Sequence, residues 1–152
     1  MYLVDTNVIS AAAPSRRAAP PALVEWMDRR SANLFLSAVS VAEIEAGITR
    51  ARREGAVAKA RDLAAWLDAL LHFYSDRVLT FDADVARVAG RLSDRARAQG
   101  RPPGFADIII AATAAHHRLI LLTRNVKHFQ PLGVAFENPF ETLPDEFPDR
   151  TI

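Results

Sequence analysis

An aspartate stands at the end of the first apolar segment of the chain. Tyr2 to Val4 are apolar and partly β-branched, and Asp5 follows them directly in the segment LVDTN. In open parallel sheets ligands bind beyond the carboxyl ends of the strands, where a carboxylate borders a cleft and avoids the cost of a dry interior. Asp5 is therefore a candidate ligand-binding group. The position also suits the N-cap of a helix beginning near Asn7, which is the structural alternative.

A second carboxylate lies in the segment LSAVSVAEIEAG. Glu43 follows Ser40 by three residues, which is the spacing of a capping box with Ser40 as the N-cap. Glu45 is the nearby competitor, but helical residues two apart point roughly 200° apart, so only one of the two can face a cleft. The small residues Ala46 and Gly47 leave room beside Glu43, and we therefore expect Glu43 to face the cleft.

A third carboxylate leads the most apolar helical segment, in GFADIIIAATAAHH. Asp107 precedes a run of residues that is apolar on nearly every side, which is typical of a central, buried helix. A first-turn acid is also favoured by the helix dipole alone. Because Asp107 follows a Pro-Pro-Gly break and begins a buried helix, we expect its side chain to point into the cleft.

Polar residues also end the fourth apolar segment, in LLTRNVKHF. Thr123, Arg124 and Asn125 occupy the expected carboxyl end of a strand. The carbonyl oxygen of Asn125 suits a hard cation or a water molecule, and Arg124 suits phosphate. A turn-forming asparagine next to a surface arginine explains the same residues without a ligand.

Short apolar runs alternate with long helical segments, which predicts parallel strands joined by crossover helices. We expect an α/β fold with a central parallel sheet covered on both faces. The expected strands are Tyr2 to Val4, Leu34 to Ser37, Val78 to Phe81, Leu119 to Leu122 and Val134 to Phe136. The expected helices are Pro21 to Arg29, Val41 to Arg53, Val57 to Phe73, Asp84 to Ala98 and Ala106 to His116.

The expected elements bring the three acids to one edge of the sheet. Asp5, Glu43 and Asp107 would repel one another there unless a cation neutralised them. Oxygen ligands in a chain without cysteine favour Mg²⁺ or Mn²⁺ over zinc. Acidic clusters that hold such ions commonly act on phosphodiesters.

Composition narrows the class of protein. The chain has 152 residues, no cysteine and a net charge of +1. Residues 77 to 133 carry nine Lys or Arg against four Asp or Glu, and such basic character helps to hold a polyanion, although arginine-rich composition alone gives the same count. The four histidines are scattered and do not indicate a metal cluster. With no apolar run long enough for a membrane, we expect a cytoplasmic protein.

In four stretches the sequence resembles PIN-domain ribonucleases, and in particular the VapC or FitB type of bacterial toxin. The stretches are LVDTNVIS, LSAVSVAEIEAGI, FADIIIAATAAHHRLILLTRN and the closing VAFENPF, spread over residues 3 to 140. The resemblance implies a three-layer α/β/α fold and RNA cleavage by water that Mg²⁺ or Mn²⁺ activates. It also implies a single PIN domain over residues 1–152, of which we expect 139–152 to be an extended, acidic, proline-containing tail.

The resemblance assigns roles to individual residues. Asp5, Glu43 and Asp107 match the family's acidic triad, and Thr6 matches a hydroxyl position that is implied to orient Asp5. The fourth acidic position falls on Asn125, which departs from the pattern. Family members often have aspartate there or three residues later, where this chain has His128. A neutral fourth ligand lowers the charge of the site by one unit, so the expected site holds one ion tightly.

Two functions follow from the resemblance. The first is the toxin of a VapBC-type pair, a homodimer that cleaves RNA and is inhibited by an antitoxin protein, with which it forms a hetero-oligomer. The segment Val57 to Leu71, with Trp66, is a candidate antitoxin groove or simply core. The second is a catalytically weak or inactive module that captures the antitoxin and joins a complex on promoter DNA, which the neutral Asn125 favours.

Overall fold

A five-stranded parallel sheet forms the centre of the protein. The structure is a computed structural model that describes residues 1–16, 18–100 and 102–144. The strands pair in the order β3-β2-β1-β4-β5, and each neighbouring pair is parallel. They are β1 Tyr2–Val4, β2 Leu34–Ser37, β3 Val78–Leu79, β4 Ile120–Leu122 and β5 Phe136–Glu137.

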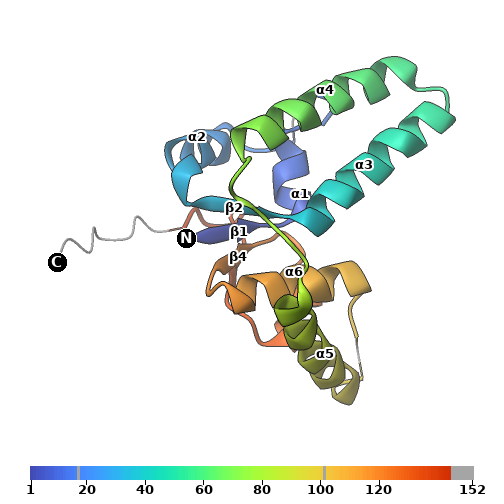
Figure 1. Ribbon diagram of the computed structural model, residues 1–152. Helices are drawn as coiled ribbons and strands as arrows, with labels where there is room; N and C mark the ends of the chain where they lie inside the picture. The colour runs from blue at the N-terminus through green and yellow to red at the C-terminus, as the bar shows by residue number, and fades with distance from the viewer. Residues whose placement is uncertain (17, 101, 145–152) are drawn as a thin grey trace.

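Helices cover both faces of this sheet and give a three-layer α/β/α architecture (Figure 1). The α-helices are α1 Thr6–Ile9, α2 Pro21–Arg29, α3 Ala38–Arg53, α4 Val57–Phe73, α5 Ala83–Ala98, α6 Phe105–His116 and α7 Val126–Phe129. Short 3₁₀ turns at Ser10–Ala12, Ser31–Asn33 and Gln130–Leu132 complete the connections.

The two core layers follow from the alternation of side chains along β1. Tyr2 and Val4 belong to one buried cluster, which also holds the apolar residues of α1, α2, α3 and α4. Leu3 points to the opposite face and joins the cluster formed with α5 and α6. Successive residues of a strand face opposite sides of the sheet, so a three-residue strand contributes to both cores.

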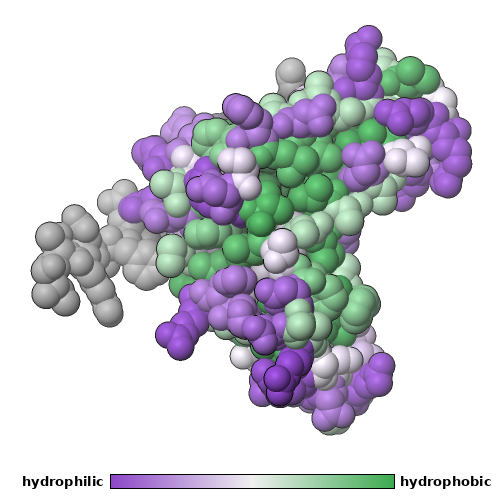
Figure 2. Space-filling model, in the orientation of Figure 1, coloured by the Kyte–Doolittle hydropathy of each residue, from purple (hydrophilic) through white to green (hydrophobic). Residues whose placement is uncertain are grey.

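The helix pattern explains how each helix packs. In α5, the buried residues Val85, Ala89, Leu92 and Ala96 recur every three or four positions and form one apolar stripe. In α6, every residue from Ile108 to Ala114 is buried, as the apolar sequence predicted. The pair α3 and α4 extends as an arm beyond the sheet, with apolar residues gathered at its base and charged residues toward its far end (Figures 1 and 2).

The predicted elements are confirmed, with changes at their ends. The edge strand β3, expected to run to Phe81, ends at Leu79. The other edge strand, β5, is shifted toward the C-terminus and covers Phe136–Glu137. Helix α3 begins at Ala38, three residues earlier than predicted, because Ser37 is its N-cap and accepts a hydrogen bond from the Val39 backbone N–H. The prediction of Ser40 as N-cap was wrong, and Ser40 is buried inside the helix.

The chain turns after β5 before the described part ends. The backbone N–H groups of Glu141 and Thr142 both donate to the Asn138 carbonyl, so residues 139–142 form a turn where an extended tail was expected. The sequence predicts that Phe140 and Phe147 pack the tail against the domain; Phe140 does pack against the first core cluster, whereas Phe147, with the rest of 145–152, lies outside the described residues. Within the described part, none of the helices combines the length and apolar character that crossing a bilayer needs.

Truncating a core side chain of α6 should destabilise the fold strongly. Ile110 is 1% exposed between the sheet and α5, so Ile110→Ala should lower the free energy of unfolding by about 2–5 kcal/mol. Val57, at the start of α4, is 64% exposed, and Val57→Ala should change it by less than about 0.5 kcal/mol. Urea unfolding of both variants checks this; equal effects would contradict the position of α6 in the core.

Candidate functional site

Asp5 lies buried at the carboxyl end of the central strand. Its backbone N–H donates to the Leu122 carbonyl at 2.9 Å, which continues the β1–β4 pairing by one residue, and Asp5 is 3% exposed. It is also the N-cap of α1, where its Oδ1 accepts from the Thr6 backbone N–H at 2.7 Å. The two readings of Asp5 are therefore compatible, because one carboxylate oxygen caps the helix while the group faces the cleft.

Two side chains hold the other oxygen of this carboxylate. Asp5 Oδ2 accepts from the Thr123 hydroxyl at 2.6 Å and from the Asn7 side-chain amide at 2.6 Å. Thr123 was a predicted site residue, whereas the role of Asn7 was missed. Its place two residues after Asp5, in the first turn of the helix that Asp5 caps, was the available signal.

Burial sets the protonation of Asp5. Its pKa is raised from 3.8 to about 6: loss of solvent is the main cause and the charges of Asp107 and Glu43 add to it, while the hydrogen bonds from Thr123 and Thr6 oppose it. The contributions of Asp107 and Glu43 to this shift agree with their positions on the walls of the same cavity as Asp5. A carboxylate in this position favours either a proton or a cation.

Glu43 faces the site from the second turn of α3. Its Oε2 accepts a hydrogen bond from the Thr6 hydroxyl, so Thr6 orients Asp5 through its backbone and Glu43 through its side chain. Glu45 does not line the cavity around Asp5, in agreement with the choice made between the two glutamates. The capping-box explanation for Glu43 is wrong, because Ser37 rather than Ser40 caps α3.

Asp107 faces the site from the first turn of α6, after the Gly104 N-cap. Its Oδ2 lies 2.9 Å from Nδ1 of His128, which belongs to the one-turn helix α7. The sequence marked His128 as a position where family members often have aspartate, but its contact with Asp107 was not predicted. The signal was the three-residue spacing between Asn125 and His128, which places His128 one helical turn beyond a predicted site residue.

The three residues that follow β4, Thr123, Arg124 and Asn125, lie in different surroundings. Thr123 bonds to Asp5 and also accepts from the Asn125 backbone N–H at 3.0 Å. The Asn125 side chain lines the cavity. Arg124, expected to bind phosphate, donates from its backbone to Asn7, and its guanidinium lies 5.0 Å from the centre of the Phe140 ring, outside the cavity lining.

One cavity of about 320 Å³ collects these groups. The four predicted residues Asp5, Glu43, Asp107 and Asn125 all line it. The sequence did not indicate its cations, which come from the segment after α1 and from the arm. The remaining lining residues are Thr6, Asn7, Ser10, Ala13, Ser15, Arg16, Ile44, Gly47, Arg50, Lys59, Leu63 and Trp66.

The donor set fits a hard divalent cation. The facing groups offer oxygen, and Asp5 Oδ1 accepts a single hydrogen bond from the described residues, which leaves it capacity for an ion. In residues 1–16, 18–100 and 102–144, no three His, Cys, Asp or Glu side chains are gathered closely enough to coordinate one ion by themselves. Mg²⁺ is usually held by one or two carboxylates and keeps several waters, so this arrangement suits it.

Comparison with known proteins places the chain among small nucleases and toxins. The family model of the PIN domain matches residues 2–131. The chain is 35% identical to VapC ribonuclease Y4jK of Sinorhizobium fredii over 147 residues, covering 93% of this chain and 99% of that protein. It is 31% identical to toxin FitB of Neisseria gonorrhoeae over 144 residues, covering 92% and 99%.

Solved structures of FitAB and VapBC complexes are similar to this chain in fold. A structure of FitAB bound to a DNA fragment superposes with a TM-score of 0.77 at 32% identity, covering 92% of this chain and 96% of that one. VapBC-5 of Mycobacterium tuberculosis, described as a member of the VapBC family of toxin–antitoxin systems, superposes with a TM-score of 0.62 at 25% identity, covering 89% and 94%.

The buried position of Asp5 predicts a pH-dependent stability in metal-free protein. Because its folded pKa of about 6 exceeds the ordinary 3.8, the folded state holds the proton more tightly than the unfolded state. This contribution is full below pH 3.8 and is lost as the pH rises through about 6, by up to about 3 kcal/mol. In urea unfolding experiments with EDTA, the free energy of unfolding should therefore fall as the pH rises from 3.8 to about 6. Asp5→Asn should abolish this fall.

Asp84→Asn is the control for this measurement, because Asp84 is exposed on α5. This substitution should leave the fall of the unfolding free energy with pH unchanged. An unchanged slope in Asp5→Asn would show that other groups cause the pH dependence.

Proposed function

The chain belongs to the PIN-domain family, and from this premise we propose that it is a Mg²⁺- or Mn²⁺-dependent endoribonuclease that acts as the toxin of a VapBC-type pair. The observation that supports the proposal most is that three acids from three separate elements line one cavity. Asp5 follows β1, Glu43 lies in α3 and Asp107 begins α6, yet the last two raise the pKa of the first.

The acids would share the work of holding the metal and orienting water. Asp5, Glu43 and Asp107 would hold Mg²⁺ or Mn²⁺ partly through water molecules, since these described acids are not gathered closely enough to coordinate one ion by themselves. The ion when bound lowers the pKa of water and offsets the negative charge that grows on the scissile phosphate. Asp5 is fixed by Thr123 and Asn7, so its carboxylate does not need to reorganise. Glu43, which among the described residues is held by the Thr6 hydroxyl, is placed to accept a proton from the attacking water.

Cations on the other walls of the cavity would hold the RNA backbone. Arg16, Arg50 and Lys59 line the same cavity as the acids and come from three different segments. Cations neutralise phosphates, whereas the acids repel an RNA strand that lacks a divalent ion. The cavity therefore combines a place for backbone phosphates with a place for the metal.

A separate groove suits the antitoxin partner. An apolar cavity of about 280 Å³ lies between α2 and α4, lined by Met27, Trp66, Leu70 and Phe73 among others. Phe73 is 56% exposed, so part of this apolar wall faces water in the single chain. We propose that an antitoxin segment packs here, that the toxin is a homodimer located in the cytoplasm, and that residues 1–152 form one PIN domain.

The alternative function is a catalytically weak or inactive module that captures the antitoxin and joins a DNA-bound complex. Two observations favour it: Asn125 supplies an amide where a fourth acid is common, and within the described residues no three acids or histidines form a preassembled metal site. The coupled acids and the cationic walls favour the nuclease, because a binding module needs neither.

Removing one acid of the site should abolish cleavage. Glu43→Gln keeps an acceptor for Thr6 but loses the charge, and it should lower kcat for RNA cleavage with Mg²⁺ or Mn²⁺ by at least about 100-fold. Asp107→Asn should have a comparable effect. Glu45→Gln, two residues along the same helix and outside the cavity, is the matched control and should retain activity. EDTA should stop the wild type.

Cleavage retained in both Glu43→Gln and Asp107→Asn would reject the nuclease proposal. Wild-type protein that folds but does not cleave RNA with either ion, nor arrest growth when expressed, would favour the binding module.

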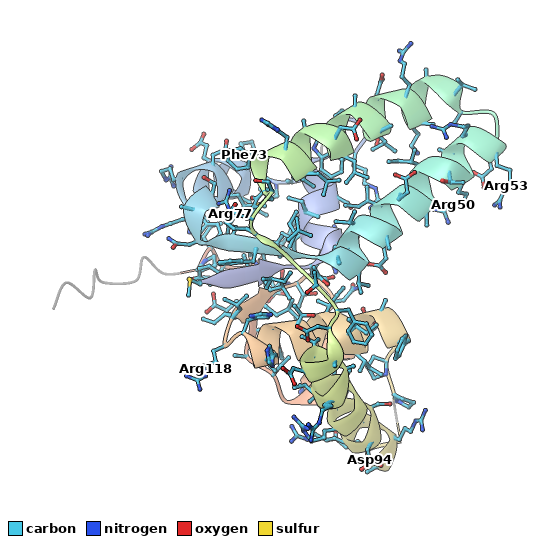
Figure 3. All side chains as sticks on the ribbon, in the orientation of Figure 1. Arg50, Arg53, Phe73, Arg77, Asp94 and Arg118 are labelled. Atoms are coloured by element: carbon cyan, nitrogen blue, oxygen red, sulfur yellow. The ribbon has the colours of Figure 1, made fainter. Side chains whose placement is uncertain are left out.

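The cationic walls predict a salt-dependent effect on substrate affinity. Arg50→Gln should raise KM by up to about fivefold with kcat unchanged, because one exposed phosphate contact is worth about 1 kcal/mol or less. It should also reduce the slope of log KM against log salt by about 0.7. Arg53→Gln on the same helix is the control, since Arg53 does not line the cavity. Figure 3 shows Arg53 nearer the far end of the arm than Arg50. Equal effects of both substitutions would indicate a general charge effect.

A further inference from the structure

His128 is the described side chain that bonds to Asp107, and its position gives it a role that the nuclease proposal leaves open. Nδ1 of His128 lies 2.9 Å from Asp107 Oδ2, while its own side chain is 54% exposed and that of Asp107 is 21% exposed. Resting on the proposed function, we infer that His128 is a positioning residue that fixes the Asp107 carboxylate for the divalent ion.

The backbone that carries His128 is fixed at both ends. Phe129, the next residue, is fully buried in the core cluster of α5 and α6. At the other end, the Asn125 backbone N–H is bonded to Thr123, which is itself bonded to Asp5. The His128 backbone N–H donates to the Asn125 carbonyl at 2.9 Å. A continuous chain of contacts thus runs from Asp5 to the imidazole on Asp107.

The same arrangement serves the other two acids. Thr123 donates to Asp5 and Thr6 donates to Glu43, so each acid has a side-chain donor on one oxygen. For Asp107 that donor is His128, which engages only Oδ2. Oδ1 accepts no hydrogen bond from the described residues and stays available to an ion. Partners that orient a ligating carboxylate from behind typically change metal affinity 10- to 100-fold when removed.

This role does not depend on the charge of the imidazole. A neutral ring with its hydrogen on Nδ1 and a protonated ring both donate from that atom. The function of His128 is therefore to supply an N–H at a fixed place. An amide nitrogen at the end of a side chain of similar length should replace it, which gives the inference a rescue test.

The test measures Mn²⁺ affinity of the folded protein by calorimetry, without RNA. His128→Ala should weaken binding by about 10- to 100-fold and leave the melting temperature close to that of the wild type, because the side chain is half-exposed. His128→Asn, which can donate from its Nδ2, should recover most of the affinity. His72→Ala is the control, since His72 is exposed on α4 away from the acids.

A second pair of variants separates positioning from direct coordination. In an Asp107→Asn background, His128→Ala should have no further effect on Mn²⁺ affinity, because the group that it positions is gone. A loss of equal size in both backgrounds would make His128 an independent ligand and overturn the inference. So would His128→Ala that binds Mn²⁺ as tightly as the wild type, or more tightly.

These outcomes differ from a failure of the proposed function. If the wild type itself binds no Mn²⁺ or Mg²⁺, the metal-dependent nuclease is rejected, and the inference with it. If the wild type binds the ion and only the His128 variants behave otherwise than expected, the nuclease proposal stands and the positioning role alone is rejected.

Discussion

The site depends on a carboxylate that the fold buries at the end of its central strand. Asp5 is almost inaccessible to solvent, and its desolvation outweighs the hydrogen bonds from Thr123 and Thr6, since the net effect raises its pKa to about 6. The fold tolerates the charge because three donors surround it, and one of them is a backbone N–H at the start of α1. Those donors also prevent the carboxylate from rotating away. The group that costs stability is thus one that three hydrogen bonds hold in place.

Topology explains why the other acids lie close to Asp5. In a parallel sheet the crossover helices run back against the strands, so the helix that follows one strand begins at the carboxyl edge. Helix α3 begins there after β2 and carries Glu43 in its second turn, and α6, which leads back to β4, begins there with Asp107 in its first turn. β1 lies between β2 and β4, so Asp5 stands between the two. Short strands sharpen this convergence, because each of them ends within a few residues of the same edge.

The sequence predicted what depends on local pattern and missed what depends on tertiary contact. The apolar runs and helical periodicity located every strand and each of the longer helices, and the strand-end rule identified Asp5 and Thr123 as partners of one edge. Ser40 was predicted as the N-cap from its spacing to Glu43, but Ser37 is the N-cap because β2 ends at that residue and α3 begins at the next one. The contact between His128 and Asp107 was missed because the two residues are 21 positions apart in the sequence, on either side of the α6–β4 connection. The burial of Phe129 and the hydrogen bond between the Asn125 backbone and Thr123 hold this one-turn helix in place, and both are tertiary contacts.

Charge along the chain and charge around the cavity are not the same quantity. The excess of positive charge lies in residues 77 to 133, yet the described residues of that block contribute Asp107 and Asn125 to the cavity lining and no cation. Arg16, Arg50 and Lys59, the lining cations among the described residues, come from residues 1 to 76, where positive and negative residues are equal in number. They reach the site because the arm of α3 and α4 and the segment after α1 wall the cleft on the side away from α6. A balanced segment therefore supplies the local positive field, since a field acts over about a Debye length and is set by folded position. The net charge of a segment of the sequence therefore does not identify the nucleic-acid-binding face until the fold is known.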